Sequence, residues 1–439
     1  MYRYIRIISI ILVLLPFTGR SQGDLKKQLS LSDAIQTGLL NNFNIGISKL
    51  NLKTAQINNT QGIAGRFPQV SLFANSNNVY DDNYSGGQES GKTDRNVLEA
   101  GLRTSWTLFS GFKVNITKKK LDALEELSEG NSEVIIENNI QSIILAYYNI
   151  LLQQGKLEVL ENIKKLSRDK YHFEMNRKEI GSSVTYNVLQ SKDSYLADSI
   201  NYLEQQLNIR KSMQNLNLLL GDQPGVQYIL TDKFEADAID FNEEELLSTV
   251  MKDNKSLRNQ YVNIKLKQYE TKLANSSLWP SISLNAGTSH SNSTIKVENH
   301  SSLSPNNINY YANISLSFNL FNGGRTRAAI KSARINEDIT SLQTKQLEFS
   351  VKNEIFTNYD LYNIRKQLVA TSMNAVETAK MNLDISLELF KNGSINSFNY
   401  RDIQLQYLNA SISHLASIFN LIDTQVELLR LSGNVIGYK

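Results

Sequence analysis

The chain has 439 residues, a formal charge of +3, no cysteine and five prolines, about a quarter of the roughly 5% proline of average proteins. The absence of cysteine excludes a disulfide framework, thiolate metal sites and a cysteine nucleophile. The scarcity of proline permits very long helices, because each interior proline would cost about 3 kcal/mol.

The first 21 residues are typical of a secretory signal peptide. Arg3 and Arg6 form its charged region, residues 7–17 its apolar core, and residues 19–21 a small-x-small cleavage site. This apolar core is too short for a transmembrane helix, which needs about 20 residues. Cleavage after Ser21 removes three arginines, which leaves 46 − 3 = 43 basic residues against 43 acidic ones. The neutral mature chain therefore shows no charge bias toward nucleic acid.

Two segments, at about 67–80 and 97–109, alternate between apolar and polar residues, as a β-strand with one apolar face does. Leu98, Leu102 and Trp106 fall on one face of the second segment. Strands with an apolar face and a Ser- and Asn-rich face suit a membrane β-barrel with a wet lumen. Half-buried strands of a soluble sheet would give the same alternation. The polar residues at about 76–95 are expected to form a solvent-facing loop between the two strands.

A proline-free segment from 112 to about 178 predicts a single long helix. Nearly 70 residues at 1.5 Å each would form a rod of roughly 100 Å. Gly181 is expected to end the rod in a left-handed cap, after which a second helix returns antiparallel. Four apolar residues of this second helix recur at heptad spacing and predict a packed coiled-coil seam: Leu196, Ile200, Leu203 and Leu207.

The second half of the chain repeats the first at a constant offset. Phe67-Pro68 recurs as Trp279-Pro280, which sets the offset at 280 − 68 = 212. Residues 106–111, 181 and 219–221 recur at the same offset as 318–323, 393 and 431–433. One common offset implies two structural copies. We therefore predict a first repeat over 22–221, a link over 222–241, and a second repeat over 242–439.

The second repeat should reproduce the elements of the first. It predicts strands at about 279–289 and 309–321, joined by a polar loop, and a helical hairpin that turns near Gly393. On its returning helix the heptad pattern is longer: Leu405, Leu408, Ile412, Leu415, Phe419, Ile422, Val426 and Leu429.

Four strands cannot close a membrane barrel, because 8 is the usual minimum and an open edge in lipid leaves backbone groups unpaired. Other copies of the chain must supply the remaining strands, so the sequence predicts an obligate oligomer. Four aromatic residues at one end of the strands predict a girdle at the membrane interface: Phe67, Trp106, Trp279 and Phe318.

No residue constellation predicts catalysis or metal binding. Residues 86–93 match the phosphate-loop pattern, but the buried strand before it and the helix after it that such a loop requires are not predicted. The four histidines lack metal-ligand spacing. We expect no enzymatic activity, no cofactor and no metal.

The signal peptide, the duplication, strands with proline at entry and Phe-x-Gly at exit, and hairpins that turn at glycine together resemble the TolC-like outer-membrane efflux protein family. The resemblance covers about 31–433. It implies a mixed α and β membrane protein, a trimer whose four strands per protomer form a 12-stranded outer-membrane β-barrel. A long periplasmic α-helical barrel of antiparallel coiled-coil hairpins would continue that barrel.

The resemblance also implies a function and partners. The function would be a passive exit duct for efflux of small molecules or for type I protein secretion. The partners would be outer-membrane lipid, a periplasmic adaptor protein and an inner-membrane transporter of the RND or ABC type. The alternative is a secreted periplasmic coiled-coil structural protein without a pore, which would explain the heptads but not the alternating strands.

Residue by residue, the resemblance concerns the two hairpin tips. Members of the family often place acids six and nine residues after the second tip glycine, as rings around the channel aperture. Here these positions hold Asn399 and Asp402, which implies one neutral and one acidic ring. Phe390 and Ile395 occupy the positions of a polar lock in the best-known member. The resemblance implies that the tips contact the adaptor through Gly181, Ser182, Gly393 and Ser394.

Overall fold

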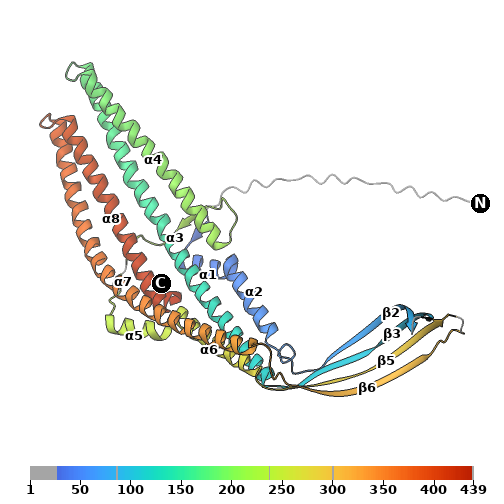
Figure 1. Ribbon diagram of the computed structural model, residues 1–439. Coiled ribbons are helices and arrows are strands. Elements are labelled where there is room, and N and C mark those ends of the chain that lie inside the picture. The colour runs from blue at the N-terminus through green and yellow to red at the C-terminus, as the bar shows by residue number, and fades with distance from the viewer. Residues whose placement is uncertain (1–26, 86–87, 237, 299–300, 438–439) are drawn as a thin grey trace, which may run out of the picture.

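The computed structural model describes residues 27–85, 88–236, 238–298 and 301–437, which form an elongated molecule (Figure 1). Two long helical hairpins run side by side toward one end, a four-stranded sheet extends from the other, and short elements surround the waist between them. The predicted signal peptide, residues 1–21, lies outside the described residues. None of the described helices has the length and apolarity that crossing a membrane would require.

The elements alternate in the same order in both halves of the chain. The first half contains β1 (Lys27–Leu29), α1 (Leu31–Asn41), α2 (Phe43–Asn58), β2 (Gln69–Ser85), β3 (Gln88–Ser110), α3 (Lys113–Glu179) and α4 (Thr185–Leu220). The second half contains β4 (Tyr228–Leu230), α5 (Glu243–Asp253), α6 (Lys255–Ser276), β5 (Ser281–Val297), β6 (Asn306–Ser317), α7 (Arg325–Lys391), α8 (Ser397–Leu431) and the short 3₁₀ helix η1 (Val435–Gly437).

The duplication extends to individual hydrogen bonds. Five pairs of elements begin at the predicted repeat offset, α1 with α5, α2 with α6, β2 with β5, α3 with α7, and α4 with α8. Asn42 Nδ2 donates to Leu219 O at 2.8 Å, and its equivalent, Asn254 Nδ2, donates to Leu431 O at 3.0 Å. Each of these asparagines also caps the helix that follows it, through its side-chain oxygen. The two halves are therefore copies of one structural unit.

The two longest helices, α3 and α7, have 67 residues each, which corresponds to roughly 100 Å. A glycine in the left-handed conformation ends the hairpin turn of each, Gly181 at φ 78° and Gly393 at φ 76°. After the first of these, Ser182 N donates to Arg177 O at 2.7 Å, and the equivalent bond closes the second turn. These bonds form Schellman caps, after which the chain reverses into α4 and α8.

The four long strands form one antiparallel sheet in the order β2-β3-β5-β6, so β2 and β6 are its edges. At the loop end they extend beyond the predicted ranges, whereas β6 ends at Ser317, short of the predicted 321. Residues 76–85 and 88–95, predicted as a loop, instead continue the β2–β3 hairpin, and β5 continues to Val297. A backbone ladder needs no apolar side chain, so pairing persists where the alternation of polarity has ended.

The phosphate-loop match lies at this extended hairpin. Gly91, Lys92 and Thr93 lie within β3 and pair with β2, and the same strand continues beyond them to Ser110. Residues 86–87 of the match lie outside the described residues. The backbone around Lys92 is therefore an extended strand rather than the strand-to-helix turn that holds a phosphate.

The apolar core lies at the waist, around the middles of α3 and α7. Here β1 and β4 pair in parallel and close over α3 together with α1 and α4. Tyr147 of α3 is fully buried, and its hydroxyl donates to Leu29 O at 2.9 Å and to the Asp232 carboxylate. Helix α8 contributes residues to both core clusters. The waist therefore fixes the two hairpins relative to each other.

The heptad seam predicted on α4 is not packed within the chain. Leu196, Ile200, Leu203 and Leu207 are between 47% and 62% exposed. The equivalent face of α8 is covered instead, since Leu408 packs against α3. The predicted coiled-coil seam therefore has no partner among the described residues of the same chain. The result is a long apolar stripe without a partner.

Candidate functional site

The aperture residues predicted from the resemblance lie on the first turns of α8. Asn396 caps this helix by accepting a hydrogen bond from Asn399 N at 2.9 Å. Asn399 and Asp402 are both exposed and, three residues apart, share one face of the helix. Gln406 Nε2 donates to Asp402 Oδ2 at 2.7 Å. The structure therefore places an exposed, oriented carboxylate one turn below the second hairpin tip.

The predicted adaptor-contact residues lie at the two hairpin turns. Gly181 and Ser182 follow α3, and Gly393 and Ser394 follow α7, and all four are exposed. The two turns belong to different hairpins and lie at the same end of the molecule (Figure 1). A partner that docks at this end meets both tips from one direction.

An aromatic cluster occupies the place of the polar lock. Phe390 is 3% exposed and stacks on Tyr400 with ring centroids 5.0 Å apart. Its ring also lies 5.3 Å from that of Phe173, on α3. Ile395 packs against the same cluster. Apolar contacts therefore join the two hairpins near the second tip.

A buried ion pair, not found by sequence reasoning, joins the hairpins next to this cluster. Arg401 of α8 binds Asp198 of α4 with both terminal nitrogens, each N–O distance being 2.8 Å. The Asp198 side chain is only 2% exposed. Beside it, Lys170 of α3 donates to Ser397 O at 2.7 Å. We call Arg401, Asp198 and Lys170 the hairpin latch.

Burial of the latch has an electrostatic consequence. Burial first, and then the nearby positive charge of Arg401, lowers the pKa of Lys170 to about 8. The lysine is still mostly protonated at neutral pH, so it donates to the first turn of α8. The latch is therefore a set of charge-assisted hydrogen bonds in a site that water barely reaches.

The predicted aromatic girdle lies where strands meet helices. Phe67 precedes β2, Trp106 lies near the end of β3, Trp279 precedes β5 and Phe318 follows β6. All four side chains are exposed. The indole of Trp106 donates to Arg66 O at 3.0 Å, which fixes the ring. Indole rings anchored in this way suit a boundary between an apolar and an aqueous phase.

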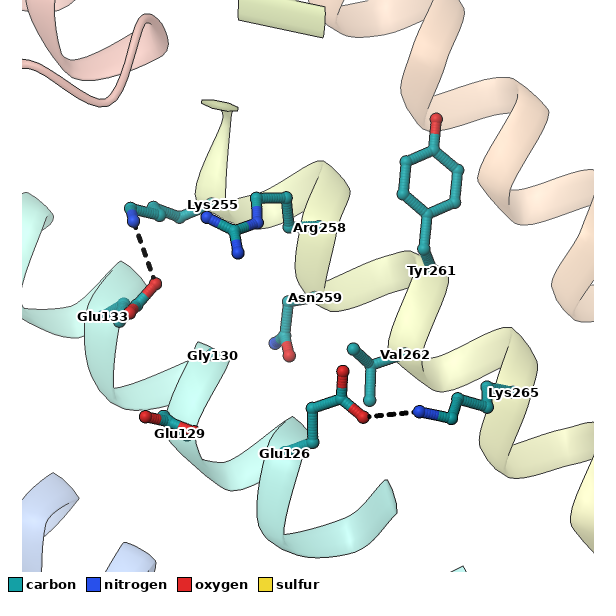
Figure 2. Close-up of a pocket in the computed structure, with 10 residues that line it drawn as sticks. All are labelled: Glu126, Glu129, Gly130, Glu133, Lys255, Arg258, Asn259, Tyr261, Val262 and Lys265. Atoms are coloured by element: carbon teal, nitrogen blue, oxygen red, sulfur yellow. Dashed lines mark hydrogen bonds and ion pairs between the residues drawn. The ribbon is translucent and has the colours of Figure 1, made fainter. Parts of the chain in front are cut away.

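The two repeats meet at a cleft of about 490 Å³ between α3 and α6 (Figure 2). Two ion pairs cross the cleft, Glu133 with Lys255 at 3.1 Å and Glu126 with Lys265 at 2.8 Å. Between these pairs, a Cβ atom built on Gly130 would lie 3.3 Å from the Asn259 Cβ and 2.4 Å from its Oδ1. The cleft is therefore a close helix–helix contact with paired charges at its rim, and it defines how one repeat packs on the next.

A buried carboxyl lies beside this cleft. Glu137 of α3 is 4% exposed, and its Oε1 finds no hydrogen-bond partner among the described residues. Burial raises the pKa of Glu137 to about 7, although Lys255 and Arg430 oppose the shift. The folded protein thus holds a proton between pH 4.5 and 7 that the unfolded chain releases, so the stability falls as the pH rises through this window.

We expect Glu137→Gln to stabilise the protein above pH 7 and to leave it unchanged near pH 4.5. The gain at pH 8 is at most about 3 kcal/mol, the free energy of a shift of this size. Denaturant unfolding of detergent-solubilised protein at both pH values measures it. Glu133→Gln, which removes an exposed and paired carboxylate, is the matched control and should show no such pH dependence. An equal gain at both pH values for Glu137→Gln would contradict the explanation.

Comparison with known proteins gives a consistent result. The model of a family described as outer membrane efflux protein matches residues 34–222 and 246–434, two matches separated by the same repeat offset (246 − 34 = 212). The toluene efflux pump outer membrane protein TtgC of Pseudomonas putida is 20% identical over 417 residues, 92% of this chain and 83% of TtgC.

Solved structures share the fold. The outer-membrane channel OprN superposes with a TM-score of 0.75 at 17% identity, over 92% of this chain and 90% of OprN. The Campylobacter jejuni CmeC outer membrane channel gives a TM-score of 0.74 at 15% identity, over 92% of this chain and 86% of CmeC.

Proposed function

Because the chain belongs to the outer membrane efflux protein family, we propose that three copies of it form a closed exit duct for small molecules. Family membership itself establishes a coarser statement. The protein is an outer-membrane efflux channel with its helices in the periplasm, it acts passively and is not an enzyme, and proteins of this kind work with an adaptor and an inner-membrane transporter. The trimer, the adaptor-contact tips and the aperture belong to the proposal.

One observation supports a ring of several copies: the outermost helix on each side of the chain exposes an apolar face that has no partner among the described residues. Helix α2 packs on α3, α3 on α6, and α6 on α7, so α2 and α7 are the outermost helices. Both expose large apolar residues, among them Ile47 and Leu50 on α2 and Leu342 and Phe349 on α7, all more than half exposed. Apolar area of this extent marks an interaction surface. The matching partner is another copy of the same chain.

The internal repeat predicts how the copies pack. Because α2 and α6 are equivalent, and so are α3 and α7, the contact between α3 and α6 in one chain is a template for α7 against α2 of the next copy. At the repeat offset, Gly130 corresponds to Leu342 and Asn259 corresponds to Ile47, so the equivalent pair between copies is apolar. The ion pair of Glu126 with Lys265 becomes Asp338 with Lys53, with the same signs.

The same repeat offset also predicts how the edge strand β6 of one copy pairs with the edge strand β2 of the next. In the chain, Leu102 of β3 lies opposite Thr288 of β5. The repeat offset places Ile314 of β6 opposite Ser76 of β2 in the next copy. Both side chains lie on the face that contains Leu72 and Leu102, so this pairing keeps the apolar face continuous. Three copies then give the 12 strands that the resemblance implies, with no open edge in lipid.

The exposed stripe of α4 has a partner under this proposal. Its residues are the equivalents of the α8 residues that pack on α3, so they face α7 of the next copy. Helix α7 exposes Leu368, Met381 and Ile385 along its length, each at least 51% exposed. The heptad pattern of α4 is then a seam between copies, and the absence of a partner in the single chain has a physical reason.

The tips supply the aperture and the docking end. Threefold symmetry would bring three Asp402 side chains around the axis, with Asn399 as a neutral ring above them. The exposed turns at Gly181, Ser182, Gly393 and Ser394 would meet the helical hairpins of an adaptor. The aromatic residues Phe67, Trp106, Trp279 and Phe318 would lie at the inner interface of the outer membrane. The relative TtgC is named for a toluene efflux pump, which favours small-molecule efflux over protein secretion.

Recording from the purified protein in a planar bilayer tests this function. We expect stable channels that prefer cations, and we expect Asp402→Ala to lower the cation-to-anion permeability ratio about twofold or more, because charged rings set selectivity at a constriction. Glu388→Gln is the matched control, since Glu388 is an exposed acid near the same tip that pairs with Lys391 on α7. Absence of any conductance would contradict the duct, and an unchanged ratio in Asp402→Ala would contradict the aperture assignment.

A further inference from the structure

The inner face of the β-sheet contains one feature that conduction does not explain. Most of this face is formed by small polar residues such as Ser283, Asn285, Ser289 and Asn313. Toward the helix end of the sheet, two aromatic residues and an arginine interrupt it, Phe73 on β2, Arg103 on the adjacent β3 and Tyr311 on β6, with β5 between β3 and β6. All three are on the face opposite Leu72 and Leu102, as the pairing register requires.

Arg103 lies between the two aromatic residues. Its guanidinium carbon is 5.1 Å from the centroid of the Phe73 ring, which is a cation–π distance. On the other side, Gly287 of β5 is directly opposite Arg103. Tyr311 leans over this glycine, since its hydroxyl would lie 2.8 Å from a Cβ atom built there. The glycine thus gives the tyrosine room to lie toward Arg103.

Arg103 takes part in none of the ion pairs between described residues. The nearest acid on its own strand and face is Glu99, four residues away, or about 14 Å along a β-strand. The residues opposite Arg103 are Ser71 and Gly287, which are small and uncharged. The Arg103 guanidinium is therefore exposed and not paired with a carboxylate of the described residues. Its N–H groups are available to bind a ligand.

We propose that Phe73, Arg103 and Tyr311 form a binding site for aromatic carboxylates on the lumen wall of the duct. The inference rests on the proposed function, which makes this face the lumen. The guanidinium would bind the carboxylate with two parallel N–H···O bonds, and the aromatic rings would pack against the ligand ring. Three such sites around the axis would form a positively charged ring near the membrane end of the duct. Its charge is opposite in sign to that of the Asp402 ring at the tip.

Block of single channels by benzoate, with acetate as the ring-free comparison, tests the site. We expect benzoate to block wild-type channels at a concentration at least about tenfold below that of acetate, because only benzoate uses both the guanidinium and the rings. Arg103→Gln should raise the half-blocking benzoate concentration about tenfold. Arg103→Lys should raise it less, about threefold, since it keeps the charge and loses the two parallel N–H···O bonds.

Arg95→Gln is the matched control, because Arg95 is on the same strand and the same face but lies opposite Val79 and Ile295. It should change the half-blocking concentration less than about twofold. Equal block by acetate and benzoate, or equal effects of the two glutamine substitutions, would overturn the site while leaving the duct intact. Absence of wild-type conductance would instead overturn the duct, so the two failures are distinguishable.

Discussion

Replacing Arg401 with alanine is expected to open the tip of the duct. The substitution leaves Asp198 buried without its partner, and breaking a buried ion pair by removing one member costs about 3–5 kcal/mol. The pair joins α8 to α4, so the free energy is lost from one of the contacts that hold the two hairpins together near the tips. A loss of about 3 kcal/mol would raise the ratio of separated to joined hairpins roughly 100-fold in each copy.

Single-channel recording measures this effect directly. We expect Arg401→Ala channels to spend most of the time in a conductance state that the wild type visits rarely. Arg168→Ala is the matched control, because Arg168 is a half-exposed arginine of α3 whose contact with Asp169 is a surface pair worth about 1 kcal/mol or less. Asp198→Asn with Arg401→Met would remove both charges and should restore much of the closed state if the unpaired carboxylate is what opens the tip. Wild-type gating in Arg401→Ala would contradict the latch.

Replacing Leu342 with aspartate is expected to prevent assembly. Leu342 is 66% exposed in the single chain, so the substitution has little effect on folding of the protomer. In the closed ring it would place a carboxylate against Ile47 of the next copy, at a cost of several kcal/mol for each seam. Three seams multiply the penalty, so the oligomer should disappear at concentrations where the wild type is fully assembled.

Light scattering of the detergent-solubilised protein measures the assembly. Asn336→Asp on the same helix is the matched control, because its first-repeat equivalent, Leu124, does not line the α3–α6 cleft. The control should assemble like the wild type. An oligomer of unchanged mass for Leu342→Asp would contradict the register of the seam.

The arrangement of helices and strands could be predicted from the sequence, because the features that indicate it are either local or repeated in both halves of the chain. Glycines in the left-handed conformation mark both hairpin turns, and the repeat offset recurs in the elements and in bonds such as those of Asn42 and Asn254. The family and the mixed α and β fold class inferred from these signals are confirmed by the family match and the shared fold.

Other features depend on information that spacing does not contain. The strand ends were missed, because residues 76–85 and 88–95 pair through the backbone while their polarity no longer alternates. The hairpin latch joins residues 203 positions apart, and neither Arg401 nor Asp198 stands out in its own helix. The stripe of Leu196 and its heptad neighbours was recognised as a seam, but a heptad pattern does not reveal whether its partner lies in the same chain.

Disulfide formation between neighbouring copies tests the closed ring most directly. The chain has no cysteine, so Ile47→Cys with Leu342→Cys introduces the only thiols. In the template pair, a Cβ atom built on Gly130 would lie 3.3 Å from the Asn259 Cβ, close to the roughly 3.5–4.5 Å of disulfides. Oxidation of the assembled protein should give a covalent product of three chains and nothing larger. A ladder that continues past three chains, or one that stops at two or four, would contradict the three-copy duct, as would the absence of linked chains when both thiols react with a small reagent.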